Sequence, residues 1–188
     1  MNNSKERIVW IDVETTGLNA SSDRLLQVAC IVTDGNLEEL HEGYESKVFY
    51  SKEEVAEIYK NTPPFVQEMH TKTGLWENLP QGKSLGVISD ELLAYVKKYV
   101  KDPRTARLGG NSITLDRNFL EANLPEVFNY INYRSYDMSS VSGFFELFAK
   151  SVKPFEKKAT HDALSDIRES IAEARHYADV LTKGDVMF

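Results

Sequence analysis

Cysteine is almost absent from this chain, whose 188 residues contain only Cys30. A single thiol excludes an internal disulfide. Cys30 lies within an apolar run, where an unpaired cysteine behaves as a small hydrophobic residue. We therefore expect a core residue at this position, with a redox role as the alternative.

Long apolar runs are also missing. No stretch approaches the roughly 18 consecutive apolar residues that a membrane-spanning helix needs. The opening Met1–Arg7 leads into a strand-like segment without the apolar region of a signal peptide. We therefore predict a cytoplasmic protein without a membrane segment. With 41% apolar and 27% charged side chains, residues 1–188 fit a single globular domain.

Basic residues are fewer than acidic ones, 22 against 29, which gives a formal net charge of −7. Proteins that follow long nucleic acids usually carry a basic stripe, so a long duplex is disfavoured as a partner. A short polyanion is compatible with this balance if metal ions lie between the carboxylates and the phosphate. Ordinary solubility is the simpler explanation of the acidic excess.

The first part of the sequence predicts three antiparallel strands. Apolar and polar residues alternate from Ile8 to Glu14, which is typical of a strand with two different faces. Leu25 to Thr33 is a nearly continuous apolar run suited to a central strand. Asp34 to Asn36 has the composition of a hairpin turn, and a third strand is expected from Leu37 to about Phe49.

The rest of the chain alternates between helical and strand-like patterns, which favours one α/β domain with a mixed sheet. We predict helices over residues 51–69 with a break at Pro63-Pro64, and over residues 89–100, 114–123, 139–148 and 162–181. Short strands are expected at residues 108–111 and 133–137.

Asp12 and Glu14 are the first residues that indicate a chemical function. Side chains two residues apart on a strand point to the same side, so the two carboxylates are expected within a few ångströms of each other. Two adjacent negative charges are unfavourable unless a hard divalent cation lies between them, and Mg²⁺ or Mn²⁺ prefers such oxygen ligands. A solvated pair at the edge of a sheet is the alternative.

Three later residues extend this pair. Asp116 is expected just inside a helix that follows a strand, where α/β folds gather ligands. Asp166 lies in the second turn of the final helix, and His161, five residues earlier, must lie at or before the N-cap to reach the same site. Taken singly, Asp116 is also explained by the helix dipole, and His161 as an exposed or capping residue.

Together these five residues resemble the DEDDh exonucleases, whose name lists them. The pattern is Asp-x-Glu-Thr-Thr-Gly from Asp12, then Asp116, then His161 and Asp166. Within that superfamily, five segments spread over almost the whole chain resemble oligoribonuclease motifs in oligoribonuclease order: Ile8–Leu18, Met69–Leu75, Gly110–Arg117, Tyr133–Ser139 and Thr160–Ser170.

The resemblance implies a ribonuclease H-like fold and an activity. Such enzymes hydrolyse di- to oligoribonucleotides from the 3′ end, release nucleoside 5′-monophosphates, and act as homodimers with two divalent metal ions. The expected partner is therefore short single-stranded RNA. The resemblance assigns metal binding to Asp12, Glu14, Asp116 and Asp166. It makes His161 the general base, for which an ordinary imidazole pKa near 6.5 is suitable.

The same resemblance implies a substrate-binding set. Leu18 would wedge between two bases, and Phe65 would stack on a base where the family usually has tryptophan. The terminal 5′ phosphate would be held by His70, Ser112, Arg134 and Ser139. Tyr133 would reach across the dimer interface. The residues alone also allow core packing for the two apolar side chains, helix capping for the serines, a surface ion pair for the arginine and an ordinary strand position for the tyrosine.

Two departures from the family pattern keep other functions open. Thr15 stands where oligoribonucleases usually have methionine, and residues 142–158 form a shorter segment with fewer arginines and tryptophans. The nearer alternative is a DEDDh exonuclease that acts on longer single-stranded DNA or RNA, in proofreading or 3′ trimming. The other is a non-catalytic nucleotide-binding protein with the same fold.

Overall fold

A mixed five-stranded sheet forms the centre of the molecule, with the strand order β3-β2-β1-β4-β5. The computed structural model describes residues 5–157 and 162–183. β1 (Arg7–Thr15), β2 (Leu25–Asp34) and β3 (Tyr44–Lys47) are antiparallel neighbours. On the other side of β1, β4 (Arg107–Gly110) and β5 (Ser135–Asp137) pair in parallel. The predicted α/β class and three-strand antiparallel meander are confirmed.

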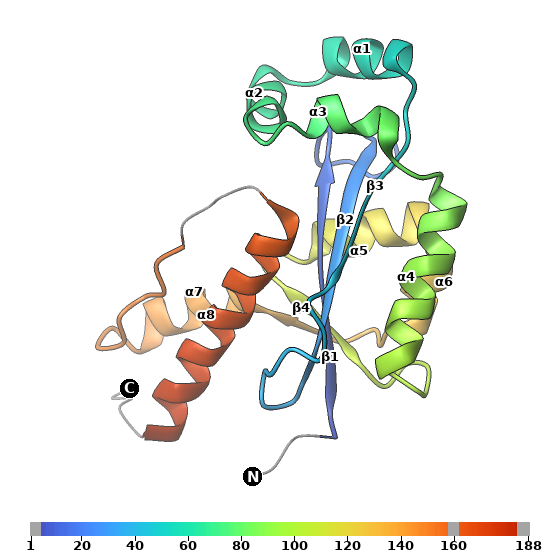
Figure 1. Cartoon of the computed structure of the whole chain (residues 1–188). Coiled ribbons are helices and arrows are strands. Elements are labelled where there is room, and N and C mark those ends of the chain that lie inside the picture. The colour runs from blue at the N-terminus through green and yellow to red at the C-terminus, as the bar shows by residue number, and fades with distance from the viewer. Residues whose placement is uncertain (1–4, 158–161, 184–188) are drawn as a thin grey trace.

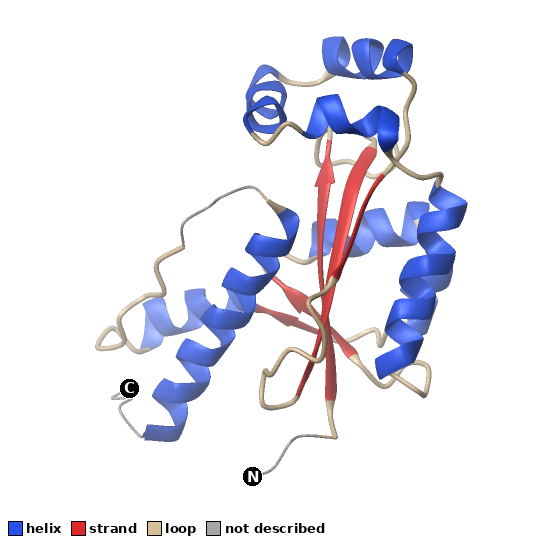
Figure 2. Ribbon diagram, viewed as in Figure 1, coloured by secondary structure: helices blue, strands red, loops and turns tan. Residues whose placement is uncertain are grey.

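Helices cover both faces of this sheet and one of its ends (Figures 1 and 2). At the end lie α1 (Lys52–Asn61), α2 (Pro64–Lys72), α3 (Leu75–Asn78) and the short 3₁₀ helix η1 (Leu79–Gln81). One face carries α4 (Leu85–Tyr99), α5 (Thr114–Asn123) and α6 (Pro125–Tyr130). α8 (Ala163–Lys183) crosses the other face, with α7 (Met138–Phe148) beside it.

The alternation predicted for β1 divides the core into two parts. Val9, Ile11 and Val13 pack with α4, α5 and α6, whereas Trp10 packs with Ile167 of α8. Because side chains two residues apart share a face, Asp12 and Glu14 lie on the same face as Trp10 and point toward α8. The pleat of one strand thus directs both carboxylates to the C-terminal helix.

Cys30 lies in the larger core and is fully buried. Burial raises the pKa of its thiol, which therefore stays protonated. The expectation of a core residue is confirmed. Among the residues that the structure describes, no helix combines the length and the apolar character needed to cross a membrane.

Two predicted boundaries were wrong. The third strand covers Tyr44–Lys47 instead of residues 37–49. Residues 38–40 pair with β2 through the separate Thr33–Glu39 bridge, and Gly43, with a positive φ of 111°, lies between this bridge and the regular ladder. The helix expected from residue 89 begins at Leu85, since the Ser84 hydroxyl accepts a hydrogen bond from the Val87 backbone and caps it. The break at Pro63-Pro64 is confirmed, with α2 beginning at Pro64.

Candidate active site

Three of the predicted metal ligands form a cluster between β1 and α8. One carboxylate oxygen from each of Asp12, Glu14 and Asp166 lies within 4.8 Å of the other two. β1 supplies the first two from one face of the strand, and the packing of Ile167 on Trp10 brings the start of α8 over that face. Carboxylates at this separation match the oxygen donor set of a hard divalent cation.

Asp116 approaches the cluster from the opposite side of β1. It lies in the first turn of α5, is almost completely buried, and accepts a hydrogen bond from the Val13 backbone N–H at 3.0 Å. This N–H is available because the pairing of β1 with β4 stops at Trp10 and Gly109, while β1 continues to Thr15. A strand edge without a neighbour therefore holds the fourth carboxylate in place.

The electrostatics of the site favour bound cations. Burial, followed by the charges of Asp116, Glu14 and Asp166, holds the pKa of Asp12 well above its ordinary value, while the Lys157 ammonium acts in the opposite direction. Burial raises the pKa of Glu14 to about 8, and neighbouring carboxylates add to the shift. Burial also raises the pKa of Asp116 to about 7, against the hydrogen bond from Val13. A divalent cation would offset this repulsion, so the donor set fits such an ion.

His161 lies outside the described residues, so its position and its role as general base stay predictions. The structure does describe the residue after it. The Asp162 carboxylate accepts a hydrogen bond from the Ser165 backbone at 3.1 Å, and the Asp162 carbonyl accepts one from the Asp166 N–H. Asp162 is therefore the N-cap of α8, and His161 precedes this cap in the sequence.

The structure places His70 behind the carboxylates instead of on the surface. Its side chain is fully buried, with Nδ1 3.8 Å from a Glu14 carboxylate oxygen and Nε2 3.0 Å from the Thr15 carbonyl oxygen. The Trp76 ring packs against it edge-on. A side chain without exposed surface does not reach a terminal phosphate in this arrangement, and His70 instead lies against the Glu14 carboxylate. The sequence motif identified the residue but not its contact.

Leu18 and Phe65 are surface residues, with 82% and 73% of their area exposed. Core packing, their alternative explanation, is therefore wrong. Leu18 lies in a turn held by Asp23, whose carboxylate accepts a hydrogen bond from the Asn19 backbone at 2.8 Å. Only glycine fits at position 17, because a Cβ there would lie 2.5 Å from that carboxylate. The turn thus presents Leu18 to solvent.

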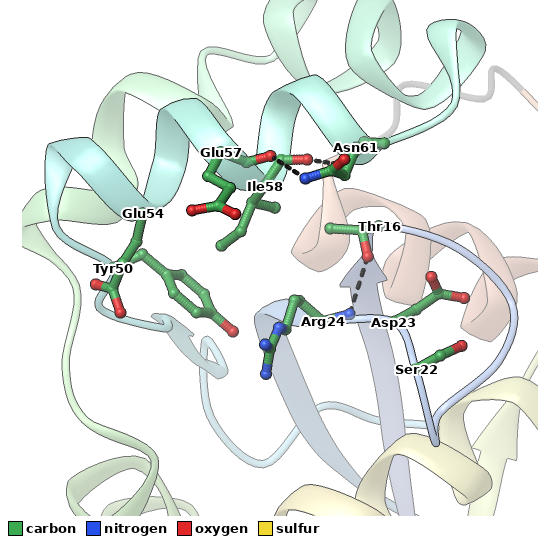
Figure 3. A pocket seen from close by; sticks show the side chains of 10 residues that line it. Thr16, Ser22, Asp23, Arg24, Tyr50, Glu54, Glu57, Ile58 and Asn61 are labelled. Carbon is green, nitrogen blue, oxygen red and sulfur yellow. Dashed lines mark hydrogen bonds between the residues drawn. The ribbon is translucent and has the colours of Figure 1, made fainter.

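A polar pocket lies between this β1–β2 turn and α1 (Figure 3). Arg24 lines it together with three acidic residues, Asp23, Glu54 and Glu57. The Thr16 hydroxyl accepts a hydrogen bond from the Arg24 backbone and closes the turn. One cation against three carboxylates is a poor match for a phosphate. None of the predicted phosphate contacts lines this pocket.

Ser112 and Ser139 come together, as expected if they share one ligand. Their hydroxyl oxygens are 3.2 Å apart, and the Ser112 N–H donates to the Ser139 hydroxyl at 3.1 Å. Neither serine caps a helix, because the Asp137 carboxylate caps α7 and α5 has no side-chain cap. Ser112 also adopts a positive φ of 49°, an uncommon conformation for a residue other than glycine and one that often accompanies a functional site.

Tyr133 and Arg134 lie elsewhere. They precede β5, whereas Ser139 follows it, and they line a cavity with Arg7, at the start of β1. The Arg134 Nε donates to the Tyr133 hydroxyl at 3.0 Å. From Arg7 to Asp12 the strand rises about 16 Å, at roughly 3.3 Å per residue. Within one chain, these two residues are therefore not gathered with the serines and the carboxylates.

Sequence reasoning missed three polar residues that lie beside the serine pair. Asn111, Lys157 and Glu173 form hydrogen bonds or ion pairs beside Ser139. Asn111 lies within a recognised motif, and Glu173 lies seven residues after Asp166 on the same helix face. That spacing is the available signal, although a charged residue at such a position is more often solvated.

Comparison with known proteins shows the family. A family model described as exonuclease (RNase_T) matches residues 9–174. The oligoribonuclease of Streptomyces coelicolor is 41% identical over 179 residues, which cover 94% of this chain and 87% of that protein. A probable oligoribonuclease of Schizosaccharomyces pombe is 35% identical over 178 residues, which cover 94% and 69%.

The chain belongs to the oligoribonuclease family of exonucleases. Its fold is also that of a solved relative. Escherichia coli exonuclease I in complex with a 5cy-dT13 oligonucleotide superposes with a TM-score of 0.70 at 15% identity, over 95% of this chain and 42% of exonuclease I. This chain therefore corresponds to about two fifths of exonuclease I, and the likeness confirms the ribonuclease H-like fold. In this member of the oligoribonuclease family, the described DEDDh carboxylates lie together around β1.

Proposed function

We propose that this chain is a metal-dependent 3′→5′ exoribonuclease that hydrolyses very short RNA to nucleoside 5′-monophosphates. The observation that carries the proposal is the cluster of Asp12, Glu14 and Asp166, with Asp116 held beside it by β1. The names of the curated relatives support short RNA as the substrate. In this proposal residues 1–188 act as one exonuclease domain, and the cytoplasmic location stays a prediction.

Two divalent ions, Mg²⁺ or Mn²⁺, would be held by Asp12, Glu14, Asp116 and Asp166. When bound, such ions supply a more acidic water and neutralise charge at the scissile phosphate. The protein contributes rigid donors, since His70 supports Glu14 and the Val13 N–H orients Asp116. His161 would take the proton of the attacking water, because an imidazole near its ordinary pKa accepts protons around neutral pH.

The substrate would lie between the apolar surface residues and the serine pair. Leu18 and Phe65 expose enough area to contact bases, and contacts of this kind do not depend on the base sequence. Ser112 and Ser139 present two hydroxyls 3.2 Å apart, a suitable geometry for one phosphate oxygen shared between them. Selection for short RNA would follow from binding the terminal 5′ phosphate at this pair.

A second copy of the chain would complete this site. Because Tyr133 and Arg134 lie far from the serine pair of their own chain, we propose that they act at the site of the partner in a homodimer. An apolar surface supports association, since Phe144, Leu147 and Phe148 on α7 each expose about half or more of their area. α7 follows β5 directly, so the same region would carry the interface and the two residues.

The test is cleavage of 5′-phosphorylated RNAs of two to about ten nucleotides with Mg²⁺ or Mn²⁺ under single-turnover conditions, with Asp12→Ala as the inactive control. Fast cleavage of dinucleotides and a steep fall with length support the proposal. Uniform rates at all lengths, or faster cleavage of longer strands and DNA, would support the alternative exonuclease instead. Metal binding without any cleavage would indicate a non-catalytic protein.

A further inference from the structure

An ion pair between Glu173 and Lys157 lies next to the serine pair, and only its carboxylate member is buried. Glu173 on α8 has only 3% of its area exposed. Its Oε2 accepts a hydrogen bond from the Asn111 side chain at 2.9 Å and lies 2.9 Å from the Lys157 ammonium. The Asn111 amide also donates to the Ser139 hydroxyl at 3.3 Å. The Glu173 carboxylate therefore contacts both the Lys157 ammonium and the Asn111 amide, which is bonded to Ser139.

The position of this network is fixed by α8. Glu173 follows Asp166 by seven residues, which places it about two turns, or roughly 10.5 Å, along the same face of the helix. Between them, the Ser170 hydroxyl oxygen lies 2.6 Å from the Asn111 side-chain oxygen and 3.0 Å from the Asp166 carbonyl oxygen, and its single proton is shared between these two acceptors. The network thus lies one step away from the carboxylate cluster, on the side of Ser139.

Lys157 is placed to meet a ligand. Its side chain keeps 32% of its area exposed despite the ion pair. It lines an open cavity together with Asn111, Ser139 and Glu173. The Glu146 carboxylate also lines this cavity, where it accepts a hydrogen bond from the Ser142 hydroxyl and keeps its negative charge. A half-exposed ammonium beside hydroxyl and amide donors is suited to a phosphate, as a point charge that tolerates several geometries.

Stability alone is a weak reason for such a pair. Burial of the Glu173 carboxylate has a desolvation cost that its attraction to the partly exposed Lys157 ammonium offsets at best, and apolar residues of the same volume often stabilise as well or better. The pair does, however, hold the Lys157 ammonium and the Asn111 amide in one place. A geometric role therefore explains the arrangement better than a stabilising one.

We propose that Lys157 is a further binding residue for the terminal 5′ phosphate of the RNA, and that Glu173 is the positioning residue that holds Lys157 and Asn111 beside Ser139. This inference rests on the proposed function and adds a cation within the same chain to the two serines. It makes preference for a 5′ phosphate partly independent of the partner subunit.

The experiment compares KM and kcat for a 5′-phosphorylated dinucleotide and the same dinucleotide with a 5′ hydroxyl. Loss of a hydrogen bond to a charged group predicts that Lys157→Met raises KM for the phosphorylated substrate about tenfold more than KM for the hydroxyl substrate. Lys157→Arg should restore most of the preference. Lys153→Met is the matched control, because Lys153 pairs with Glu156 on the exposed surface of the same segment.

Glu173→Gln keeps the shape and an oxygen for Asn111 while removing the charge that holds Lys157. It is expected to raise KM for the phosphorylated substrate only. Equal losses on both substrates, an unchanged preference in Lys157→Met, or a Glu173→Gln variant that lowers only the melting temperature would overturn the inference. Failure of the proposed function is distinguishable, since it is measured on the wild-type protein as missing cleavage or missing length dependence.

Discussion

The Asp116 carboxylate and the Val13 backbone N–H are joined by a hydrogen bond of 3.0 Å. It occupies the part of β1 that β4 leaves unpaired beyond Trp10. A backbone donor that would otherwise be buried without a partner is satisfied, and a carboxylate from a distant part of the sequence is held beside Asp12. The Asp116 carboxylate therefore lies where β1 has no neighbouring β4 residue to pair with.

Neutralising Asp12 is expected to abolish activity while stabilising the metal-free fold. Asp12→Asn removes a proposed metal ligand, and a loss of several kcal/mol of transition-state stabilisation corresponds to roughly 1,000-fold or more in kcat. It also removes a charge that Glu14, Asp116 and Asp166 repel. In EDTA at pH 8, the melting temperature should rise by about 2–4 °C for each kcal/mol of relieved repulsion. Asp90→Asn, an exposed change on α4, should leave both values unchanged.

The stability of the metal-free protein is expected to fall as pH rises from about 4 to 8. Glu14 has a pKa of about 8 and Asp116 about 7, both above the ordinary carboxyl range near 4. Between these values the folded state binds more protons than the unfolded state, so each unit of rising pH destabilises it. Thermal unfolding across this range in EDTA checks the slope. Mg²⁺ or Mn²⁺ should reduce it, and an equal slope with and without metal would contradict the proposed site.

Leu18→Ala is expected to weaken substrate binding without weakening the fold. The side chain is 82% exposed, so the free energy of unfolding should change by no more than about 0.5 kcal/mol. A leucine packed on a base buries apolar surface worth about 0.8 kcal/mol per CH₂ group, which predicts a rise of roughly 10-fold in KM for a dinucleotide. Denaturant unfolding and steady-state kinetics measure the two effects. A large loss of stability with unchanged KM would assign Leu18 to the fold.

Mixing an inactive variant with a variant impaired in binding tests the shared site. Asp12→Ala removes the metal ligand of its own chain, and Arg134→Ala removes the residue proposed to act in the partner. In a mixed dimer, one of the two sites then combines an intact Asp12 with an Arg134 from the other subunit. Activity should therefore rise above the mean of the two separate variants on mixing and subunit exchange. If mixtures show only this mean activity, Arg134 does not act across an interface.

The elements that sequence predicted well are those whose pattern is set by local packing. β1 alternates because its two faces pack against different helices, and this alternation also placed Asp12 and Glu14 on one side. The limits of the third strand escaped prediction because the positive φ angles of Leu37 and Gly43 divide the segment into a separate bridge at Glu39 and the short strand β3. Composition does not determine a backbone angle at a residue such as leucine.

Within the site, sequence predicted residue types better than contacts. The four carboxylates were expected at one place, and the structure gathers them around β1. The burial of His70 depends on Trp76 and on the carbonyl of Thr15, which belong to different elements. Likewise, Arg134 and Ser139 are separated because β5 runs between them. The sequence motif contains both residues but does not indicate this separation.

Asp166 and Glu173 belong to one uninterrupted helix, so insertions and deletions between them carry a specific penalty. One added residue would rotate everything beyond it by about 100° and shift it by about 1.5 Å along the axis. The metal ligand would keep its place while Glu173 turned away from Asn111 and Lys157. A point substitution between Asp166 and Glu173 changes only the contacts of one side chain. A change in the number of residues between them instead rotates one carboxylate around the helix axis relative to the other. The spacing of seven residues is therefore a constraint on α8 that is independent of which residues fill it.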